Sequence, residues 1–368
     1  MSVTWLLHKE LEGSSGVSVD YRLDGNLFNI RRLQAATKVK TVNLVELQYA
    51  DDCAFVAHTS EALQATLTAA VKAYSRLGLT VNTTKTEVLC QWNSPPPTPP
   101  PSPAFSIDNN PLAVVPDFKY LGSILSNNCS MDNDVQNRIK SASASFGRLR
   151  KRVFVNKVLN IHTKVAVYQA ICVSTLLYGC EAWTLYRRHI RQLENFHIKC
   201  LQRIIGLTWR DRVPHTEILK RTGTKSMEAT FLQHQLRWVG HTIRMPEDRL
   251  PRQLLYGQLR HGQRSAGGQK RRYKDQLKTT LKRCGIPHTQ LESSASDRTL
   301  WRRLCHTGLQ SFEEERSEAR EKKRQKRKMA TTAKAPTNTD FKCQHSLQYR
   351  PCGSRIGLYN HLKTHQSP

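Results

Sequence analysis

Two adjacent carboxylates, Asp51 and Asp52, have the type and spacing that metal-dependent chemistry requires. Nucleotidyl transfer by two metal ions needs carboxylates that hold two Mg²⁺ ions about 3.5–4 Å apart. The pair follows Tyr49 and Ala50 and lies between two short apolar segments within residues 43–57. Because aspartate tolerates the left-handed backbone of a tight turn, the pattern predicts a β-hairpin whose turn is at Asp51-Asp52. An ordinary turn with two aspartates could have the same four residues. The elements around it must therefore show whether it is a metal-binding hairpin or only a turn.

The residues after this hairpin predict a helix and then a strand. Thr59 or Ser60 suits the start of the helix, and Gly78 is the residue type that most often ends one. Four side chains at helical spacing would share the buried face: Leu63, Leu67, Val71 and Tyr74. We expect a short strand at residues 79–81, followed by Lys85.

Residues 93–104 are rich in proline and predict an exposed insert, because proline cannot sustain a helix or a strand ladder. A stiff spacer is favoured over a ligand for a proline-recognising domain. A hairpin is predicted to follow within residues 105–128, and it contains Lys119, Tyr120 and Gly122.

This order of motifs resembles the palm of reverse transcriptases from non-LTR, LINE-type retrotransposons. Tyr49 to Asp52 match the family's Y/F-A-D-D motif, and the segment from Gly78 to Thr86 matches its G-L-x-x-N-x-x-K-T motif. The resemblance implies that Asp51 and Asp52 bind Mg²⁺ and that Lys85 lies near the phosphates of the incoming nucleotide. Residues 118–122 are similar to the F-x-Y-L-G hairpin that holds the primer end, which assigns that role to Lys119, Tyr120 and Gly122. Segments 176–185 and 236–241 resemble the region after the palm, so the similarity extends along essentially the whole chain.

The family's other catalytic carboxylate and its G-x-x-Q-G nucleotide-pocket motif are not found in residues 1–48. Asp20 and Asp24 flank Tyr21-Arg22-Leu23, which fits the stretch just before Y-A-D-D instead. We therefore expect a C-terminal fragment of an RNA-directed DNA polymerase that is catalytically incomplete by itself.

The charge predicts a polyanionic partner. Lysine and arginine total 57 against 29 acidic residues, a net charge of +28, and an excess of this size is typical of nucleic-acid-binding proteins. We expect contacts with template–primer RNA and DNA from a basic cluster made of Lys270, Arg271, Arg272 and Lys274. Four aromatic residues among the basic ones are expected to pack in the core more readily than to stack on bases: Trp209, Trp238, Tyr273 and Trp301.

The C-terminal residues 341–368 have the outline of a degenerate finger with two cysteine and two histidine ligands. Cys343, His361 and His365 could hold Zn²⁺ together with either Cys352 or His345. Because small modules of this kind depend on their metal to fold, a decayed finger is the alternative. A non-catalytic protein that binds zinc and nucleic acid is the alternative function.

These patterns together predict an α+β fold. Its expected parts are a partial palm (1–92), the proline-rich insert (93–104), a primer-grip-like hairpin (105–128), a helical thumb-like region (129–245), a basic helical region (246–328), a linker (329–340) and the finger-like module (341–368). Helix is expected at 176–183, 187–204, 227–244 and 313–328.

Cellular location is predicted from the absence of two features. No apolar run approaches the roughly 18 residues of a membrane span, and the cysteines form neither C-x-x-C pairs nor a dense framework. We expect a reduced protein of the nucleus or cytoplasm, without a membrane and without a defined protein partner. Residues 322–328 could serve as a nuclear-localisation run or as the solvated end of a basic helix.

Overall fold

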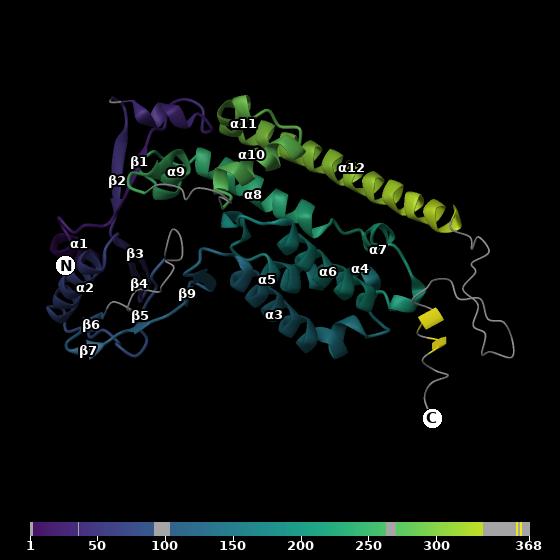
Figure 1. Ribbon diagram of the computed structural model, residues 1–368, viewed down its shortest axis with the longest axis horizontal. Helices are drawn as coiled ribbons and strands as arrows, with labels where there is room; N and C mark the ends of the chain where they lie inside the picture. Colours follow the sequence, from purple (N-terminus) through teal and green to yellow (C-terminus); the bar gives the residue numbers. More distant parts are fainter. Residues whose placement is uncertain are drawn as a thin grey trace. The chain divides into compact units, whose positions relative to one another are not determined.

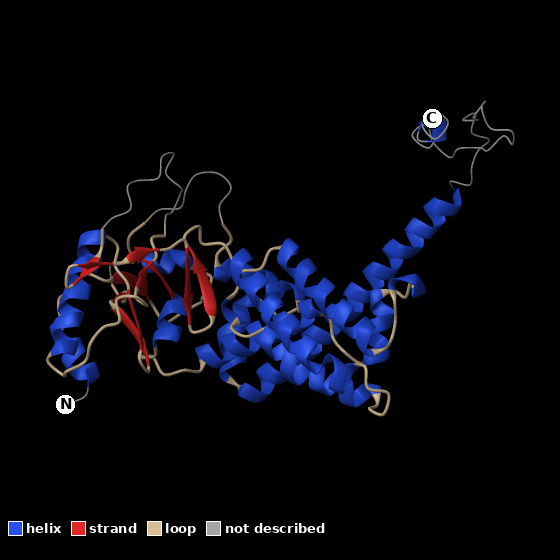
Figure 2. Ribbon diagram, turned by 90° about the horizontal axis from the view of Figure 1, so that it is seen from below, coloured by secondary structure: helices blue, strands red, loops and turns tan. Residues whose placement is uncertain are grey.

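The computed structural model describes residues 3–35, 37–91, 104–262, 270–333, 358–359 and 361–362. The chain divides into two compact units, residues 1–313 and 314–368. The first contains all the strands among these residues and most of the helices (Figures 1 and 2). The expected mixture of helix and sheet is confirmed. None of the described helices is long and apolar enough to cross a membrane.

The strands form small sheets rather than one large one. β1 (Val17–Tyr21) is the centre of a three-stranded antiparallel sheet and pairs with β2 (Lys40–Leu44) on one side and β11 (Gly257–Leu259) on the other. The remaining pairs are β3 (Glu46–Tyr49) with β4 (Asp52–Phe55), β5 (Glu87–Val88) with β8 (Ala113–Val114), β6 (Ser106–Ile107) with β7 (Asn110–Pro111), and β9 (Asp117–Tyr120) with β10 (Ser123–Ser126). The pairing of β1 with β11 joins the start of the chain to its helical part.

Helix α2 (Ser60–Ser75) forms where its sequence predicts, but Tyr74 packs in a different cluster from Leu63, Leu67 and Val71. The Thr59 side chain accepts a hydrogen bond from the Ala62 amide at 3.2 Å and so caps the helix. Leu67 is buried, and Leu63 and Val71 pack against the same small core as Phe55 of β4. The helix α1 (Val3–Glu10) packs on the other side of α2 through Leu7 and Leu11. Gly78 has a φ of +72°, as expected for a residue that follows a helix end.

The helical part contains two clusters of buried side chains. The larger runs from Val135 to Phe312 and includes Leu27 from the N-terminal segment, and the smaller is built around Phe146, Phe154 and Tyr168. Residues of both 129–245 and 246–313 contribute to the larger cluster. The helices are α3 (Asp132–Leu149), α4 (Ile161–Val167), α5 (Ser174–Leu176), α6 (Arg187–Ile204), α7 (His215–Thr222), α8 (Met227–Ile243), α9 (Leu250–Tyr256), α10 (Tyr273–Arg283), α11 (Leu291–Ser296) and α12 (Arg298–Ala333). Shorter turns of 3-10 or π-helix are η1 (Ile30–Gln34), η2 (Arg150–Phe154), η3 (Tyr168–Val173), η4 (Cys180–Ala182), η5 (Trp209–Asp211) and η6 (His288–Gln290).

Glycine at position 240 allows α8 and α12 to approach each other closely. A Cβ atom at Gly240 would overlap the indole ring of Trp301, whose Nε1 donates a hydrogen bond to the Leu236 carbonyl at 3.1 Å. Trp301 is 3% exposed, which confirms the expected core role. Trp238 is 36% exposed and lies outside this core.

Three expectations about secondary structure were wrong in part. Residues 79–81 form no strand, because an apolar run needs a free strand edge to pair with and β5 pairs with β8 instead. The segment 176–183 is buried as predicted but is not a continuous helix, because Gly179 has a φ of +73° and breaks it. Helix α12 contains 313–328 but continues to Ala333, since alanine and methionine favour helix, so residues 329–333 are not linker. The proline-rich insert, apart from Ala104, lies outside the described residues.

The turn between β9 and β10 carries a strained residue. Leu121 and Gly122 have φ values of +47° and +81°, the signature of a type I′ turn, which asparagine followed by glycine suits best. We expect Leu121→Asn to raise the free energy of unfolding by about 1 kcal/mol, because asparagine tolerates the left-handed conformation. Chemical denaturation would measure the change. Leu125→Asn is the matched control: its side chain is similarly exposed, at 42%, but it lies within β10 and should lower stability. Equal effects of the two variants would contradict the strain at Leu121.

Candidate nucleic-acid interface

The first candidate element is the hairpin formed by β3 and β4. Tyr49 pairs directly with Asp52, so the two-residue turn is Ala50-Asp51 and not the predicted Asp51-Asp52. Ala50, with a φ of +54°, takes the left-handed conformation that we expected of an aspartate. Asp51 is therefore at the tip and Asp52 begins β4, and both side chains are exposed. Tyr49 is 64% exposed beside them.

The hairpin is fixed from behind by α2. Cys53 follows Asp52 on β4, and its Sγ lies 3.1 Å from the hydroxyl of Tyr74 on α2. Burial and the hydrogen bond to Cys53 raise the pKa of the Tyr74 hydroxyl well above its ordinary value. Phe55 contacts the small cores on both faces of α2. These contacts hold the base of the hairpin and leave its acidic tip in solvent.

A second hairpin, β9–β10, lies against the first. The Tyr120 hydroxyl donates a hydrogen bond to the Leu47 carbonyl at 3.1 Å, although the two residues are 73 positions apart. Burial, with a smaller effect of Cys53 and Asp52, raises the pKa of this hydroxyl. Lys119 is exposed on the same strand, opposite Ile124. The structure thus brings Lys119, Tyr120 and Gly122 to the neighbourhood of the β3–β4 hairpin.

The helical core fixes the second hairpin through Asp134 of α3. This carboxylate is 1% exposed; its Oδ1 accepts a hydrogen bond from the Ile124 amide at 3.0 Å and its Oδ2 accepts one from Trp183 Nε1 at 2.7 Å. Arg138, one helical turn later, places its Nε 3.8 Å from Asp134. A buried carboxylate is stable only when it is hydrogen-bonded or paired in this way.

Arg138 and Tyr178 are residues of this site that sequence reasoning missed. The guanidinium lies 4.7 Å from the centre of the Tyr178 ring, and its Nη2 donates to Ser123 Oγ at 3.3 Å. A Cβ at Gly122 would lie 3.6 Å from Arg138 Nη2, so the arginine sits directly against the turn. The i,i+4 spacing of Asp134 and Arg138 in the sequence indicates an ion pair on one helix face. That spacing does not reveal that Arg138 contacts the β9–β10 hairpin.

Lys85 lies in an exposed turn that its neighbour Asn82 organises. The Asn82 Oδ1 accepts hydrogen bonds from Thr84 Oγ1 at 2.7 Å and from the Lys85 amide at 3.2 Å. Among the described contacts, none joins Lys85 to Asp51 or Asp52. Direct interactions among the described residues therefore do not bring Lys85, Asp51 and Asp52 into one cluster.

Asp51 and Asp52 are not grouped with a third metal-ligating side chain among the described residues. Within the ranges that the structure describes, no group of three or more His, Cys, Asp or Glu side chains could hold a metal ion. Asp20, on β1, accepts a hydrogen bond from Thr41 Oγ1 of β2 at 2.7 Å. Asp24 pairs with Arg22, which lowers the pKa of its carboxyl to about 2. Neither Asp20 nor Asp24 therefore joins Asp51 and Asp52 in these contacts.

The four cations predicted at 270–274 have different surroundings. Lys270 Nζ donates to the Asn128 carbonyl just after β10. The Arg271 amide donates to the Tyr186 hydroxyl at 3.1 Å, and its guanidinium lies 5.7 Å from the Tyr186 ring. Arg188 lies 5.3 Å from the same ring, so Tyr186, which sequence reasoning missed, is an aromatic residue between two arginines. Its position before Arg187-Arg188 was the available signal.

Lys274, which we predicted as a nucleic-acid contact, is partly buried. Its Nζ is turned inward and donates to the Gly257 carbonyl at 2.8 Å, while Arg272, which is partly buried, begins the cap of α10 through its amide and Asp275. Burial, Arg32 and Arg272 together lower the pKa of the Lys274 ammonium to about 8. The position of Lys274 within the first turn of an amphipathic helix explains why its sequence context misled us.

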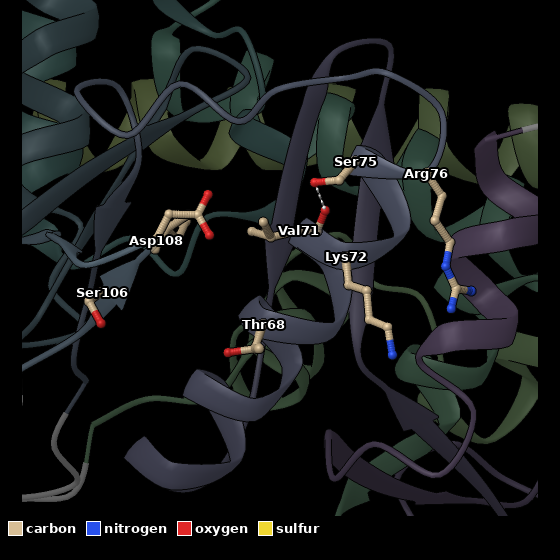
Figure 3. Close-up of a pocket in the computed structure, with 8 residues that line it drawn as sticks. Thr68, Val71, Lys72, Ser75, Arg76, Ser106 and Asp108 are labelled. Atoms are coloured by element: carbon tan, nitrogen blue, oxygen red, sulfur yellow. Dashed lines mark hydrogen bonds between the residues drawn. The ribbon is translucent and has the colours of Figure 1, made fainter.

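A cavity of about 500 Å³ lies elsewhere, along α2 beside the β6–β7 hairpin (Figure 3). It is lined by Thr68, Val71, Lys72, Ser75, Arg76, Ser106, Ile107 and Asp108. None of these is a predicted site residue, and Arg76 pairs with Glu10 of α1. The zinc-ligand candidates Cys343, His345, Cys352 and His365 lie outside the described residues, and His361 belongs to the short helical segment 361–362.

Comparison with known proteins finds similarity to a protein of Caenorhabditis elegans described as uncharacterized and transposon-derived. The two are 25% identical over 274 residues, which cover 72% of this chain and 96% of the relative. No family model matches the chain. No solved structure matches it either. The similarity indicates a transposon-related origin.

The inward position of Lys274 predicts a pH dependence of stability. Its pKa in the folded chain, about 8, is below the ordinary 10.5, so between these values the unfolded chain keeps a proton that the folded chain has lost. Stability contributed by this group therefore rises with pH from about 8 to 10 and is flat below 8. We expect the difference in unfolding free energy between the wild type and Lys274→Met, in chloride buffer, to follow this course. Lys278→Met, which changes an exposed lysine of the same helix, is the control, and a flat difference for Lys274→Met would contradict the burial.

Proposed function

We propose that the chain is the C-terminal part of a non-LTR retrotransposon reverse transcriptase, that it binds nucleic acid, and that it does not polymerise by itself. The observation that carries the proposal is the hydrogen bond between Tyr120 and Leu47. It sets a F-x-Y-L-G hairpin beside a Y-A-D-D hairpin, the arrangement that the family resemblance implies for a primer-holding element next to a metal-binding one. The transposon-derived relative supports the same origin.

The distribution of charge supports nucleic acid as the ligand. Residues 135–180 contain eight lysines and arginines and no aspartate or glutamate. Six of these cations are exposed on α3, η2 and the loop before α4: Lys140, Arg148, Arg150, Lys151, Arg152 and Lys157. A surface of one sign attracts phosphates without reading sequence. This segment follows the two hairpins directly, which is where a thumb-like grip on a duplex would be needed.

The number of carboxylates supports the absence of catalysis. Each Mg²⁺ in a two-metal centre must be held by oxygen ligands that also position it against the second ion. Two exposed carboxylates on one hairpin, with no third acid grouped with them among the described residues, leave that requirement unmet. Lys85 remains our candidate for a phosphate contact in the parent enzyme.

We expect the purified chain with Mg²⁺ to extend neither an RNA-primed nor a DNA-primed template. Incorporation of labelled nucleotides would be measured for the wild type and for Asp51→Asn, with an active reverse transcriptase as the positive control. The two chains should give the same background signal. Extension by the wild type that Asp51→Asn abolishes would overturn the inactive part of the proposal.

We expect binding to RNA and DNA that is tolerant of sequence and sensitive to salt. The association constant, measured by filter binding, should fall at least about tenfold between 50 and 200 mM salt, because several counterions are released from the phosphates. Lys119→Gln should weaken binding and reduce the slope of log K against log salt by about one, whereas Lys119→Arg should preserve both. Affinity that is indifferent to salt would contradict a phosphate-dominated interface.

A further inference from the structure

Tyr178 exposes an aromatic ring beside the turn of the β9–β10 hairpin. Its side chain is 56% exposed, although Leu176 and Leu177 directly before it are buried in the larger helical cluster. Gly179, which follows, has a φ of +73° and directs the chain into η4. A large aromatic side chain therefore lies in solvent at the end of a buried segment.

One face of this ring is covered by Arg138. The guanidinium carbon lies 4.7 Å from the ring centre, a distance at which a cation is attracted to an aromatic face. The arginine is buried, its Nη2 donates to Ser123 Oγ at 3.3 Å, and its Nε lies 3.8 Å from the Asp134 carboxylate. The ring of Tyr178 thus rests on a cation that the helical core and the hairpin both hold in place, and an ordered side chain loses little entropy when it binds.

One edge of the ring lies against the hairpin turn. A Cβ atom at Gly122 would be 3.9 Å from Tyr178 Cε1, and a Cβ atom at Gly179 would be 3.4 Å from Ser123 Oγ. These contacts bring the segment of Tyr178 directly to the tip of the β9–β10 hairpin. Because Arg138 covers one face and Gly122 adjoins one edge, the exposed area belongs mainly to the opposite face.

The charges around the ring favour a polyanion as its partner. Lys119 is exposed on β9, close to the same turn. Residues 135–180, which supply both Arg138 and Tyr178, contain no aspartate or glutamate. Asp134, the acid in this contact network, is 1% exposed and lies behind the arginine. A flat ring among cations is the combination with which proteins bind single-stranded nucleic acid, because the cations attract phosphates and the ring stacks on bases.

We propose that Tyr178 is a stacking platform for a nucleobase of the strand that the β9–β10 hairpin holds, in the order guanidinium, tyrosine ring, base. Every base has a π-face, so such a contact tolerates any sequence but requires a base. An unpaired base and the last base of a duplex have a face to offer, whereas a base inside a duplex is stacked on both sides. This inference rests on the nucleic-acid binding proposed above, and it adds a contact that phosphates alone cannot make.

The test compares strands that keep every phosphate but lack a base. The full chain would be titrated, at one salt concentration, with a duplex that carries a single-stranded overhang. The same duplex would also be used with abasic nucleotides in the overhang, or with an abasic nucleotide at the 3′ end of the recessed strand. The wild type should bind one of the two abasic ligands at least about fivefold more weakly than the intact one. The position that matters shows whether the stacked base is unpaired or terminal.

Substitutions of the ring show whether Tyr178 makes this contact. Tyr178→Leu should bind intact and abasic ligands equally, because leucine keeps an apolar side chain but has no ring, whereas Tyr178→Phe should keep the preference of the wild type. Trp5→Leu is the matched control. It also removes an exposed ring that faces a cation, since Trp5 is 52% exposed and Lys9 Nζ lies 5.4 Å from its ring centre, and it should leave the preference unchanged.

Three results would count against the inference. Salt-dependent binding by the wild type without any preference for intact strands would overturn the stacking contact and leave the proposed phosphate binding in place. Equal losses of preference in Tyr178→Leu and Trp5→Leu would overturn it too, because the effect would then not belong to this ring. Absence of binding to every strand would overturn the proposed nucleic-acid function, and this inference with it.

Discussion

The buried carboxylate of Asp134 connects the parts of this molecule that carry its candidate function. It accepts one hydrogen bond from the Ile124 amide of β10 and one from the Trp183 indole, and it is 1% exposed. Because a buried carboxyl group is stable only with such partners, the hairpin and Trp183, which directly follows η4, are both fixed to the first turn of α3. The opposite strand of that hairpin then places Tyr120 on Leu47. Asn133, the preceding residue of α3, adds hydrogen bonds to Asp117 of β9 at 2.9 and 3.0 Å, so the position of this hairpin depends on the first turn of α3.

Both hairpin tips store backbone strain. Ala50 and Leu121 have positive φ values, which cost a residue with a Cβ about 1–2 kcal/mol each. Such conformations persist only where the surroundings determine them. The contacts of Cys53 and Phe55 with α2 do so for the first hairpin, and Asp134 with Arg138 does so for the second. Ala50 is next to the aspartates that the family resemblance assigns to Mg²⁺, and Leu121 is next to the residues that it assigns to the primer end.

The positive charge of the chain occurs in two different settings. Exposed cations on α3 and η2 form a surface that suits a polyanion. Other cations are turned inward: Arg138 stacks on Tyr178 behind a hairpin tip, Arg32 is buried beside the Tyr256 ring, and the partly buried Lys274 donates to the Gly257 carbonyl. A count of lysines and arginines cannot separate these groups, because both kinds occur in amphipathic helices and their turns. Burial alone decides which cations are available to a ligand in solution.

The sequence by itself determined the local features. The Thr59 cap, the apolar face of α2, the bounds of α6 and the two hairpins follow from capping, periodicity and turn chemistry, all of which act between residues close in the chain. The tertiary structure decided the rest. It moved the turn to Ala50-Asp51, left residues 79–81 without a strand partner, turned Lys274 inward and set Arg138 against Gly122. Each of these depends on which distant segment supplies a strand edge, a carbonyl or a counter-charge. Asp51 and Asp52 could therefore be recognised from the sequence. The hairpin that lies beside them, through the contact of Tyr120 with Leu47, could be known only from the fold.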